Sequence, residues 1–187
     1  MNINLVTSNQ GKVEELTAIL RPFGHTASQL PVKCPEIQAM TLEEVVDFAL
    51  TWLHGQKTPA PLIIDDAGVF VDGLEGFPGV YSRYVYDTIG LQGILKQMEN
   101  LEDRQASFKC VLGLLLEDGT THKFVGECKG RIIHEMRGDG GFGYDPIFIP
   151  DGFDRTFAEL PPEEKNEISH RGRAMQNLLA FISEKGL

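Results

Sequence analysis

The sequence predicts an α/β protein in which helices flank a mixed β-sheet that is divided into two lobes around a cleft. Three observations lead to this prediction. Short apolar runs alternate with segments of helical periodicity in the first half of the chain. In the second half, the turn signal Asp118-Gly119 separates two extended runs, which predicts a hairpin. Strands linked by helices usually pair in parallel, whereas hairpin strands pair antiparallel, so a sheet that contains both is mixed.

Length and composition are those of one ordinary domain over residues 1–187, with no repeat and no linker. Apolar residues make up 42% of the chain and charged residues 24%. The formal net charge of −10 argues against sequence-independent binding of nucleic acid, which needs clustered cations. A cationic pocket for a small anion remains compatible with that charge. No apolar stretch is long enough to predict a membrane span.

The three cysteines fit neither a set of paired disulfides nor a CxxC metal pattern. Cys110 lies in an apolar run and is predicted to be a small core residue. The chain begins without a basic segment followed by a long apolar stretch, so no secretory signal is predicted. We therefore expect a reduced, cytoplasmic protein.

The predicted elements begin with a buried strand over residues 3–6 and a turn over residues 7–11. A helix follows, with Glu14 and Glu15 in its first turn, and it ends at Pro22 and Gly24; its apolar positions are Val13, Leu16, Ile19 and Leu20.

Thr41 and Glu44 have the spacing of a capping box at the start of a second amphipathic helix. After the prolines at 59 and 61, a buried strand over residues 62–64 is predicted to end at Asp65-Asp66, with residues 69–71 extended again and a loop over 73–79.

The second half begins with a predicted helix over residues 89–98. The longest predicted strand covers 106–116, and extended segments follow at 123–127, 130–134 and 147–149, with a glycine-rich loop at 138–143. The final helix is predicted from residue 162 to residue 179.

The first candidate site is the turn between the first strand and the first helix, Thr7-Ser8-Asn9-Gln10-Gly11-Lys12. Backbone N–H groups at a helix start attract anions, and Lys12 adds a full positive charge there. The spacing does not match a Walker A motif. The alternative is a simple N-capped helix after a turn.

The second candidate site is Asp65-Asp66, with Glu36 upstream. Adjacent carboxylates repel when they are buried, and a divalent cation such as Mg²⁺, which prefers hard oxygen ligands, relieves that repulsion. The alternative is a solvated turn.

The third candidate site combines a glycine-rich loop with a polar segment further along the chain. Phe142 and Tyr144 offer flat faces on which a base could stack, and Arg171 could contact a phosphate or a carbonyl. The alternatives are a flexible loop and an exposed polar helix.

Five motifs occur in order along the chain: Thr7-x-Asn9-x-x-Lys12, Asp65-Asp66 with Gly68, Gly76-x-Pro78-Gly79-x-x-Ser82, Phe142-Gly143-Tyr144-Asp145 and Glu164-Lys165-Asn166-x-x-Ser169-His170-Arg171. Together they resemble the inosine triphosphate pyrophosphatase (Ham1-like) family over about residues 3 to 182. The segment around Pro35-Glu36 is similar to the metal-binding glutamate segment of that family.

The resemblance implies a two-lobed fold around a long mixed sheet, a homodimer, and Mg²⁺-dependent hydrolysis of ITP, dITP and XTP to the monophosphate and pyrophosphate. It implies that residues 7–12 hold the triphosphate, that Glu36 and Asp66 hold the metal with Asp65 nearby, and that Asp66 accepts a proton. Residues expected at the nucleotide are Phe142, Gly143, Tyr144, Asp145, Lys165, His170 and Arg171.

Three positions depart from the family pattern. Ser8 stands where the opening motif often has glycine, a change that some members share. Ala67 replaces a common serine or threonine whose hydroxyl reaches the substrate, and Arg83 stands where a lysine is common. The alternatives left open are a non-catalytic nucleotide sensor and a pyrophosphatase for other modified nucleotides.

Overall fold

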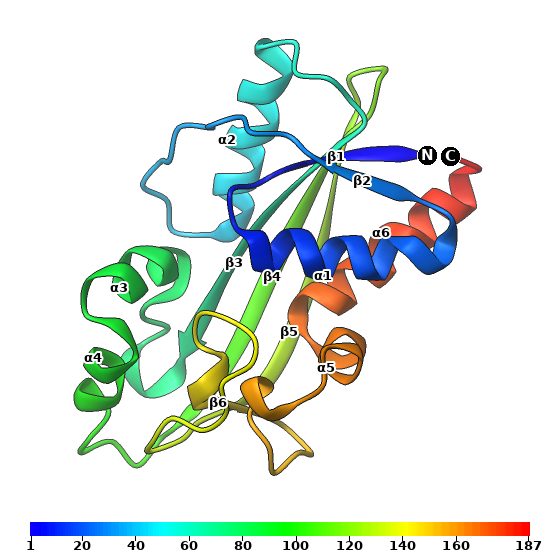
Figure 1. The fold of residues 1–187 in the computed structure, drawn as a ribbon. Helices are drawn as coiled ribbons and strands as arrows, with labels where there is room; N and C mark the ends of the chain where they lie inside the picture. Colours follow the sequence, from blue (N-terminus) through cyan, green and yellow to red (C-terminus); the bar gives the residue numbers. More distant parts are fainter.

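The computed structural model describes residues 1–187, and its α/β fold has one six-stranded mixed sheet with flanking helices, which confirms the predicted fold class (Figure 1). The strands are β1 (Asn2–Val6), β2 (Thr26–Gln29), β3 (Leu62–Val71), β4 (Gln105–Leu115), β5 (Thr121–Ile132) and β6 (Phe148–Pro150). The helices are α1 (Gln10–Leu20), α2 (Leu42–Gly55), α3 (Ser82–Thr88), α4 (Gly90–Gln97), α5 (Pro162–Ile168) and α6 (His170–Lys185). None of them has the length and apolar character that a membrane crossing requires.

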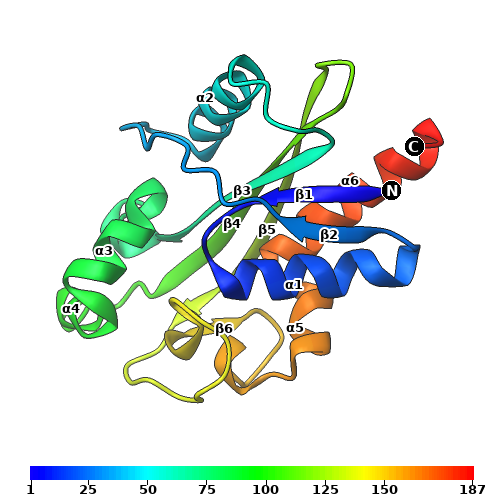
Figure 2. The ribbon, with the colours of Figure 1, turned by 45° about the horizontal axis from the view of Figure 1, so that its top comes forward.

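The sheet order is β2-β1-β3-β4-β5-β6. β1 pairs in parallel with β2 and β3, and the remaining neighbours pair antiparallel. Helices α1 and α6 cover one face of the sheet and α2 covers the other (Figures 1 and 2). A third apolar cluster joins α3, α4 and β6 to the far end of the long strands. The elements thus form two groups along β3, β4 and β5.

The edge of β3 becomes free halfway along the strand, because β1 is much shorter. The last pair between them is Val6 with Ile64, after which the chain of β1 turns away into α1. Further along, the segment before α3 covers the same edge: Phe70 bridges to Pro78, and the Val69 N–H donates to the Ser82 hydroxyl. Residues 65–68 therefore lie at a gap in the sheet edge.

Several predicted boundaries were wrong, and pairing explains most of them. β3 runs through the two aspartates to Val71 because every one of its residues pairs with β4. The extended pieces predicted at 123–127 and 130–134 belong to the single strand β5 for the same reason, except that β5 ends at Ile132 and leaves residues 133 and 134 outside it. β2 and α3 were not predicted, since β2 is polar and largely exposed and α3 is short.

Helix ends account for the other differences. α1 begins at Gln10 after its N-cap Asn9, so its first turn holds no acidic residue, and Glu14 and Glu15 come later. The predicted final helix is two helices, because the extended backbone of Ser169 ends α5 and its hydroxyl accepts from the Gly172 N–H to begin α6.

Candidate active site

A cavity of about 660 Å³ opens at the gap in the edge of β3, a size typical of small-molecule sites. It brings together most of the residues singled out from the sequence. Those that line it are Thr7, Ser8, Asn9, Lys12, Glu36, Asp65, Asp66, Ala67, Arg83, Phe142, Gly143, Tyr144, Asp145, Lys165, His170 and Arg171. Gln10 and Gly11 do not line it, so these two predicted contacts are not supported.

The start of α1 forms one wall of the cavity. The Asn9 side chain caps the helix by accepting a hydrogen bond from the Lys12 N–H at 3.2 Å, and Thr7 Oγ1 accepts from the Asn9 N–H at 3.1 Å. Gln10 turns toward Glu14 instead. Gly11 supports the wall from behind, because a Cβ at this position would lie 2.5 Å from the Phe142 ring. The same residues therefore form both the N-cap of α1 and the candidate anion site, so the two interpretations of this segment do not exclude each other.

Asp65 and Asp66 lie on opposite faces of the sheet, since successive side chains of a strand alternate. Asp65 is paired in register with Leu112, which packs under α1 and α6, and Asp66 with Val111, which packs under α2. The two carboxylates therefore do not form a shared cation site, and the idea of a solvated turn is also wrong.

Asp65 is held by cations on the α1 and α6 side. Its side chain is only 1% exposed, and its carboxylate pairs with Lys12 Nζ at 2.5 Å and with Arg171 Nε at 2.7 Å. Lys12 also donates to the Asp65 carbonyl at 2.9 Å, at the free edge of β3. Burial alone would raise the pKa of Asp65, but Arg171 and Lys12 hold it well below its usual value. Both oxygens of Asp65 already have basic partners, which argues against the role as a metal ligand that the sequence suggested for it.

Asp66 has no such partner. Its Oδ2 atom is buried and makes no hydrogen bond. Burial raises the pKa of Asp66 to about 6, and Asp65 and Glu36 add to this effect while Lys12 opposes it. Glu36 lines the same cavity from an exposed loop between β2 and α2. A carboxylate whose buried oxygen makes no hydrogen bond, with a second carboxylate lining the same cavity, is an arrangement that a divalent cation stabilises.

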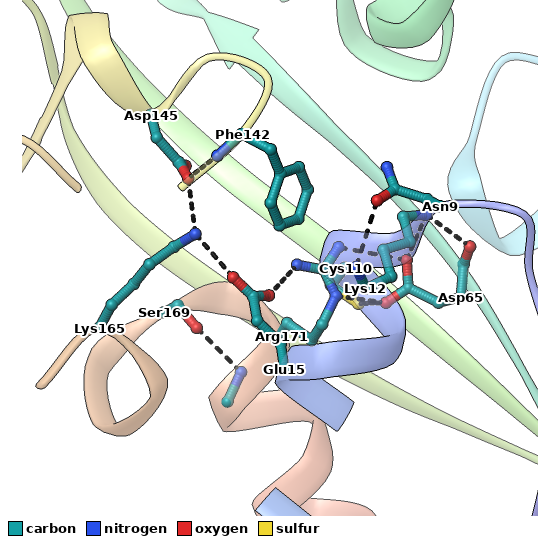
Figure 3. A network of polar contacts seen from close by, with 11 residues as sticks. Asn9, Lys12, Glu15, Asp65, Cys110, Phe142, Asp145, Lys165, Ser169 and Arg171 are labelled. Atoms are coloured by element: carbon teal, nitrogen blue, oxygen red, sulfur yellow. Dashed lines mark hydrogen bonds and ion pairs between the residues drawn. The ribbon is translucent and has the colours of Figure 1, made fainter. Parts of the chain in front are cut away.

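Glu15 bridges Lys165 and Arg171, the two basic residues of the last sequence motif, as Figure 3 shows. Its carboxylate accepts from Lys165 Nζ at 2.7 Å and from Arg171 Nη1 at 2.6 Å. Lys165 also donates to Asp145 Oδ2 at 2.6 Å. Burial disfavours the charge of Glu15, but Arg171 and Lys165 lower its pKa below the usual value. A continuous chain of ion pairs therefore runs from Asp65 on β3 to Asp145 in the glycine-rich loop.

The Phe142 ring covers these ion pairs on the side of the cavity. It lies 4.8 Å from Lys165 Nζ and 5.6 Å from the Arg171 guanidinium carbon (Figure 3). The Phe142 N–H donates to Asp145 Oδ2 at 2.8 Å, which fixes the loop from which the ring projects. The ring therefore presents a flat apolar face in front of two cations whose charges are already balanced.

His170 is buried and neutral. Its ring stacks on Phe108 with centroids 4.6 Å apart, and its Nδ1 atom makes no hydrogen bond. Burial, together with the neighbouring Arg171, holds the pKa of His170 well below its usual value. His170 and Arg171 are part of a buried wall, so the alternative of an exposed polar helix is wrong.

The charges around the cavity do not favour a free polyanion. Four basic side chains line it, against five acidic ones. Each basic group is already paired: Lys12 with Asp65, Arg83 with Asp87, Lys165 with Asp145, and Arg171 with Asp65 and Glu15. The two carboxylates left without a basic partner are Asp66 and Glu36. A negatively charged ligand would therefore need to bring its own cation.

Sequence reasoning missed several residues of the site. Glu15 was interpreted only as a residue that favours the helix dipole. No local sequence pattern could link it to Lys165 and Arg171, because they are far away in the sequence. The other missed residues that line the cavity lie on the strands β3 and β4 or around α3; they are Val69, Val80, Tyr84, Tyr86, Asp87 and Phe108. Gly68 and Ser82 also line it; both belong to motifs noted in the sequence, but no role for them followed from it.

Comparison with known proteins gives consistent matches over nearly the whole chain. The sequence model of the Ham1 family matches residues 3–181. A dITP/XTP pyrophosphatase of Pyrococcus horikoshii is 56% identical over 182 residues, which cover 97% of each chain. One of Thermococcus kodakarensis is 53% identical over 98% of each chain. The structure of the Ham1 protein of Staphylococcus aureus superposes with a TM-score of 0.83 at 30% identity, covering 99% of this chain and 100% of that one.

Proposed function

This chain belongs to the Ham1 family, and from that membership we propose that it is a pyrophosphatase that hydrolyses dITP, ITP and XTP to the monophosphate and pyrophosphate. The observation that carries the proposal is a single cavity lined by the start of α1, by a wall of balanced charges and by Asp66, whose buried Oδ2 atom makes no hydrogen bond. The physiological form that we propose is a cytoplasmic homodimer, with a purine nucleoside triphosphate as its ligand.

We propose that Asp66 and Glu36 hold Mg²⁺. Two carboxylates fit this ion, because Mg²⁺ commonly takes one or two protein carboxylates together with substrate phosphates. When bound, the ion would offset the charge of the triphosphate and stabilise the negative charge that builds up on the departing pyrophosphate. Asp65 is not included, since its oxygens are taken up by Lys12 and Arg171.

The two ends of the cavity suit the two ends of a nucleotide. The phosphates would lie at the start of α1, where Thr7, Ser8 and Asn9 offer polar groups and Lys12 offers a charge. The purine would lie against Phe142, in front of the balanced pairs of Lys165 and Arg171, because a neutral ring needs no net charge opposite it. His170 lines the same cavity, with its Nδ1 atom buried. Ala67 cannot add a hydroxyl contact.

The chain's own residues provide the remaining steps. Asp66 would orient a water molecule and take its proton at a carboxylate oxygen while the water oxygen bonds to the α-phosphorus. The bond from that phosphorus to the oxygen bridging the β-phosphate breaks, and pyrophosphate leaves with the bridging oxygen. Lys12 would stabilise the charge on the phosphate oxygens, while Asp65 keeps the Lys12 ammonium in place beside the strand. Phe142 would hold the base, so that the scissile bond lies opposite Asp66.

The test of this proposal is a substrate panel with and without Mg²⁺. We expect pyrophosphate release from dITP, ITP and XTP with Mg²⁺, rates at least about 100-fold lower for ATP and dUTP, and no release in EDTA. A protein that binds ITP with Mg²⁺ but never releases pyrophosphate would be a nucleotide sensor instead. Preference for a pyrimidine substrate would place it among pyrophosphatases for other nucleotides.

Lys12→Ala is expected to weaken binding of the phosphate end only. The KM for dITP should rise about 10-fold, because one charged contact to the triphosphate is lost. The inhibition constant of deoxyinosine, which has no phosphate, should change by less than about 2-fold. Both are measured by competition in the pyrophosphate-release assay. Equal weakening of deoxyinosine and dITP would rule out the phosphate role of Lys12.

A further inference from the structure

Tyr144 lies in the loop that carries Phe142, but its ring is not free to stack on a base. Its side chain is in the core, only 4% exposed, in the cluster that includes Val85 and Phe148. Tyr86 meets the ring edge-on, with centroids 5.8 Å apart. The stacking surface expected for Tyr144 from the sequence is therefore not present, and the polar group that this side chain brings to the site is its hydroxyl.

The Tyr144 hydroxyl crosses from this loop to the start of α3. It donates a buried hydrogen bond to the Ser82 carbonyl at 2.8 Å, 62 positions away in the sequence. Burial raises the pKa of Tyr144 well above its usual value, so the hydroxyl remains a donor. The contact joins two segments that otherwise reach the cavity from different elements.

Ser82 is in turn tied to the strand that carries Asp66. Its hydroxyl accepts from the Val69 N–H at 2.9 Å and donates to the Gly79 carbonyl at 2.6 Å. Gly68 packs so closely on this segment that a Cβ there would lie 2.2 Å from the Gly79 carbonyl oxygen. Ser82 therefore has little freedom to move relative to β3, and Tyr144 is anchored to β3 through it.

The other end of the same loop is anchored to α1 and α6. Asp145, next to Tyr144, holds the Phe142 N–H and Lys165, which continues to Glu15. Phe142 thus projects from a loop with two attachments on different sides of the cavity. The attachment through Asp145 is ionic, and the one through Tyr144 is a single neutral hydrogen bond.

We propose that Tyr144 is a positioning residue: its hydrogen bond to Ser82 sets the separation between Phe142, which binds the base, and Asp66 on β3. This inference rests on the proposed function. A nucleotide spans both positions, so it binds well only if the separation matches its length. A separate base or a separate pyrophosphate has no such requirement.

Tyr144→Phe tests the inference, because it removes the hydroxyl and keeps the ring. We expect the KM for dITP to rise about 3- to 10-fold, the range that one neutral hydrogen bond represents, with kcat within about 2-fold of wild type. The inhibition constants of deoxyinosine and of pyrophosphate with Mg²⁺ should each stay within about 2-fold. Tyr81→Phe is the matched control, since Tyr81 lies beside Ser82 but does not line the cavity, and its KM should not change.

Ser82→Ala removes the hydroxyl that connects Ser82 to Val69 on β3, and it gives a second measurement. Its KM for dITP should also rise, and the double variant with Tyr144→Phe should exceed the worse single variant by less than about 2-fold, because both interrupt one connection. An unchanged KM in Tyr144→Phe would overturn the inference, as would a loss that is shared by deoxyinosine and pyrophosphate. If the wild type does not hydrolyse dITP, the proposed function itself fails.

Discussion

Asp66→Asn is expected to lower kcat for dITP by about 10³-fold, because the amide can neither take a proton from water nor hold Mg²⁺ as a carboxylate does. The melting temperature should fall by less than about 2 °C. In the folded protein the Asp66 carboxylate is buried, and one of its oxygens has no partner, so removal of its charge relieves a cost of burial. The measurements are steady-state pyrophosphate release and thermal unfolding.

A suitable control is Asp47→Asn, which removes a carboxylate far from the cavity. Asp47 pairs with Lys123 at the surface, and both side chains are at least one-third exposed. This variant should keep full activity and change stability by less than about 1 kcal/mol. An Asp66→Asn protein that keeps more than about a tenth of the wild-type kcat would exclude Asp66 as the proton acceptor.

Asp65→Asn, one position earlier, is expected to affect the fold itself. Its carboxylate is the shared partner of Lys12 and Arg171, and Arg171 is 2% exposed. Loss of one member of a buried ion pair leaves the other insufficiently compensated and typically costs about 3–5 kcal/mol. Since Glu15 remains beside Arg171, we expect the lower end of that range, a drop in melting temperature of about 6–12 °C.

The pKa of Asp65 determines the direction in which this contribution to stability changes with pH. The folded state holds this pKa below its value in the unfolded chain, so the ionised carboxylate stabilises the fold at neutral pH, and the contribution disappears as the pH falls. The stability difference between wild type and Asp65→Asn should therefore shrink in acid. A melting temperature within about 2 °C of wild type at neutral pH would contradict the role given to Asp65.

The two adjacent aspartates thus have different expected roles: substitution of Asp66 lowers kcat, and substitution of Asp65 lowers the stability of the fold. Alternation along β3 sends their side chains to different faces, and the charged groups near them differ: Asp65 is paired with Lys12 and Arg171 from α1 and α6, whereas Asp66 has no basic partner and has the carboxylate of Glu36 near it. If Asp65→Asn lowered kcat and Asp66→Asn lowered the melting temperature instead, the roles assigned to the two aspartates would be reversed.

Local patterns were sufficient to predict most of the fold. The helical spacing after Asn9, the capping box at Thr41 and the turn at Asp118-Gly119 all correspond to elements of the structure. Prediction failed where pairing with a distant strand decides the conformation, as at Asp65-Asp66, which would be an unusual interior for an isolated strand. It also failed for β2, whose four residues carry almost no apolar signal.

The candidate site was predictable in its members more than in their arrangement. Motifs identified Lys12, Lys165 and Arg171 as cations of the site, and all three line the cavity. They could not indicate that each cation already has a carboxylate partner, because those partners come from elsewhere in the chain. Glu15 is 150 positions from Lys165 and 156 from Arg171.

By itself, the sequence determined which chemical groups are available to this protein: its helix starts, apolar faces and polar motifs, since these depend on side chains a few positions apart. Only the tertiary structure decided which charges are compensated. It buried Asp65 among Lys12 and Arg171, left Asp66 without a partner, and directed the Tyr144 hydroxyl to Ser82 instead of toward a ligand. The physical reason is that the energy of a charge or a hydroxyl depends on neighbours in space and on the exclusion of water, and these neighbours are brought together by strand pairing and helix packing between distant segments.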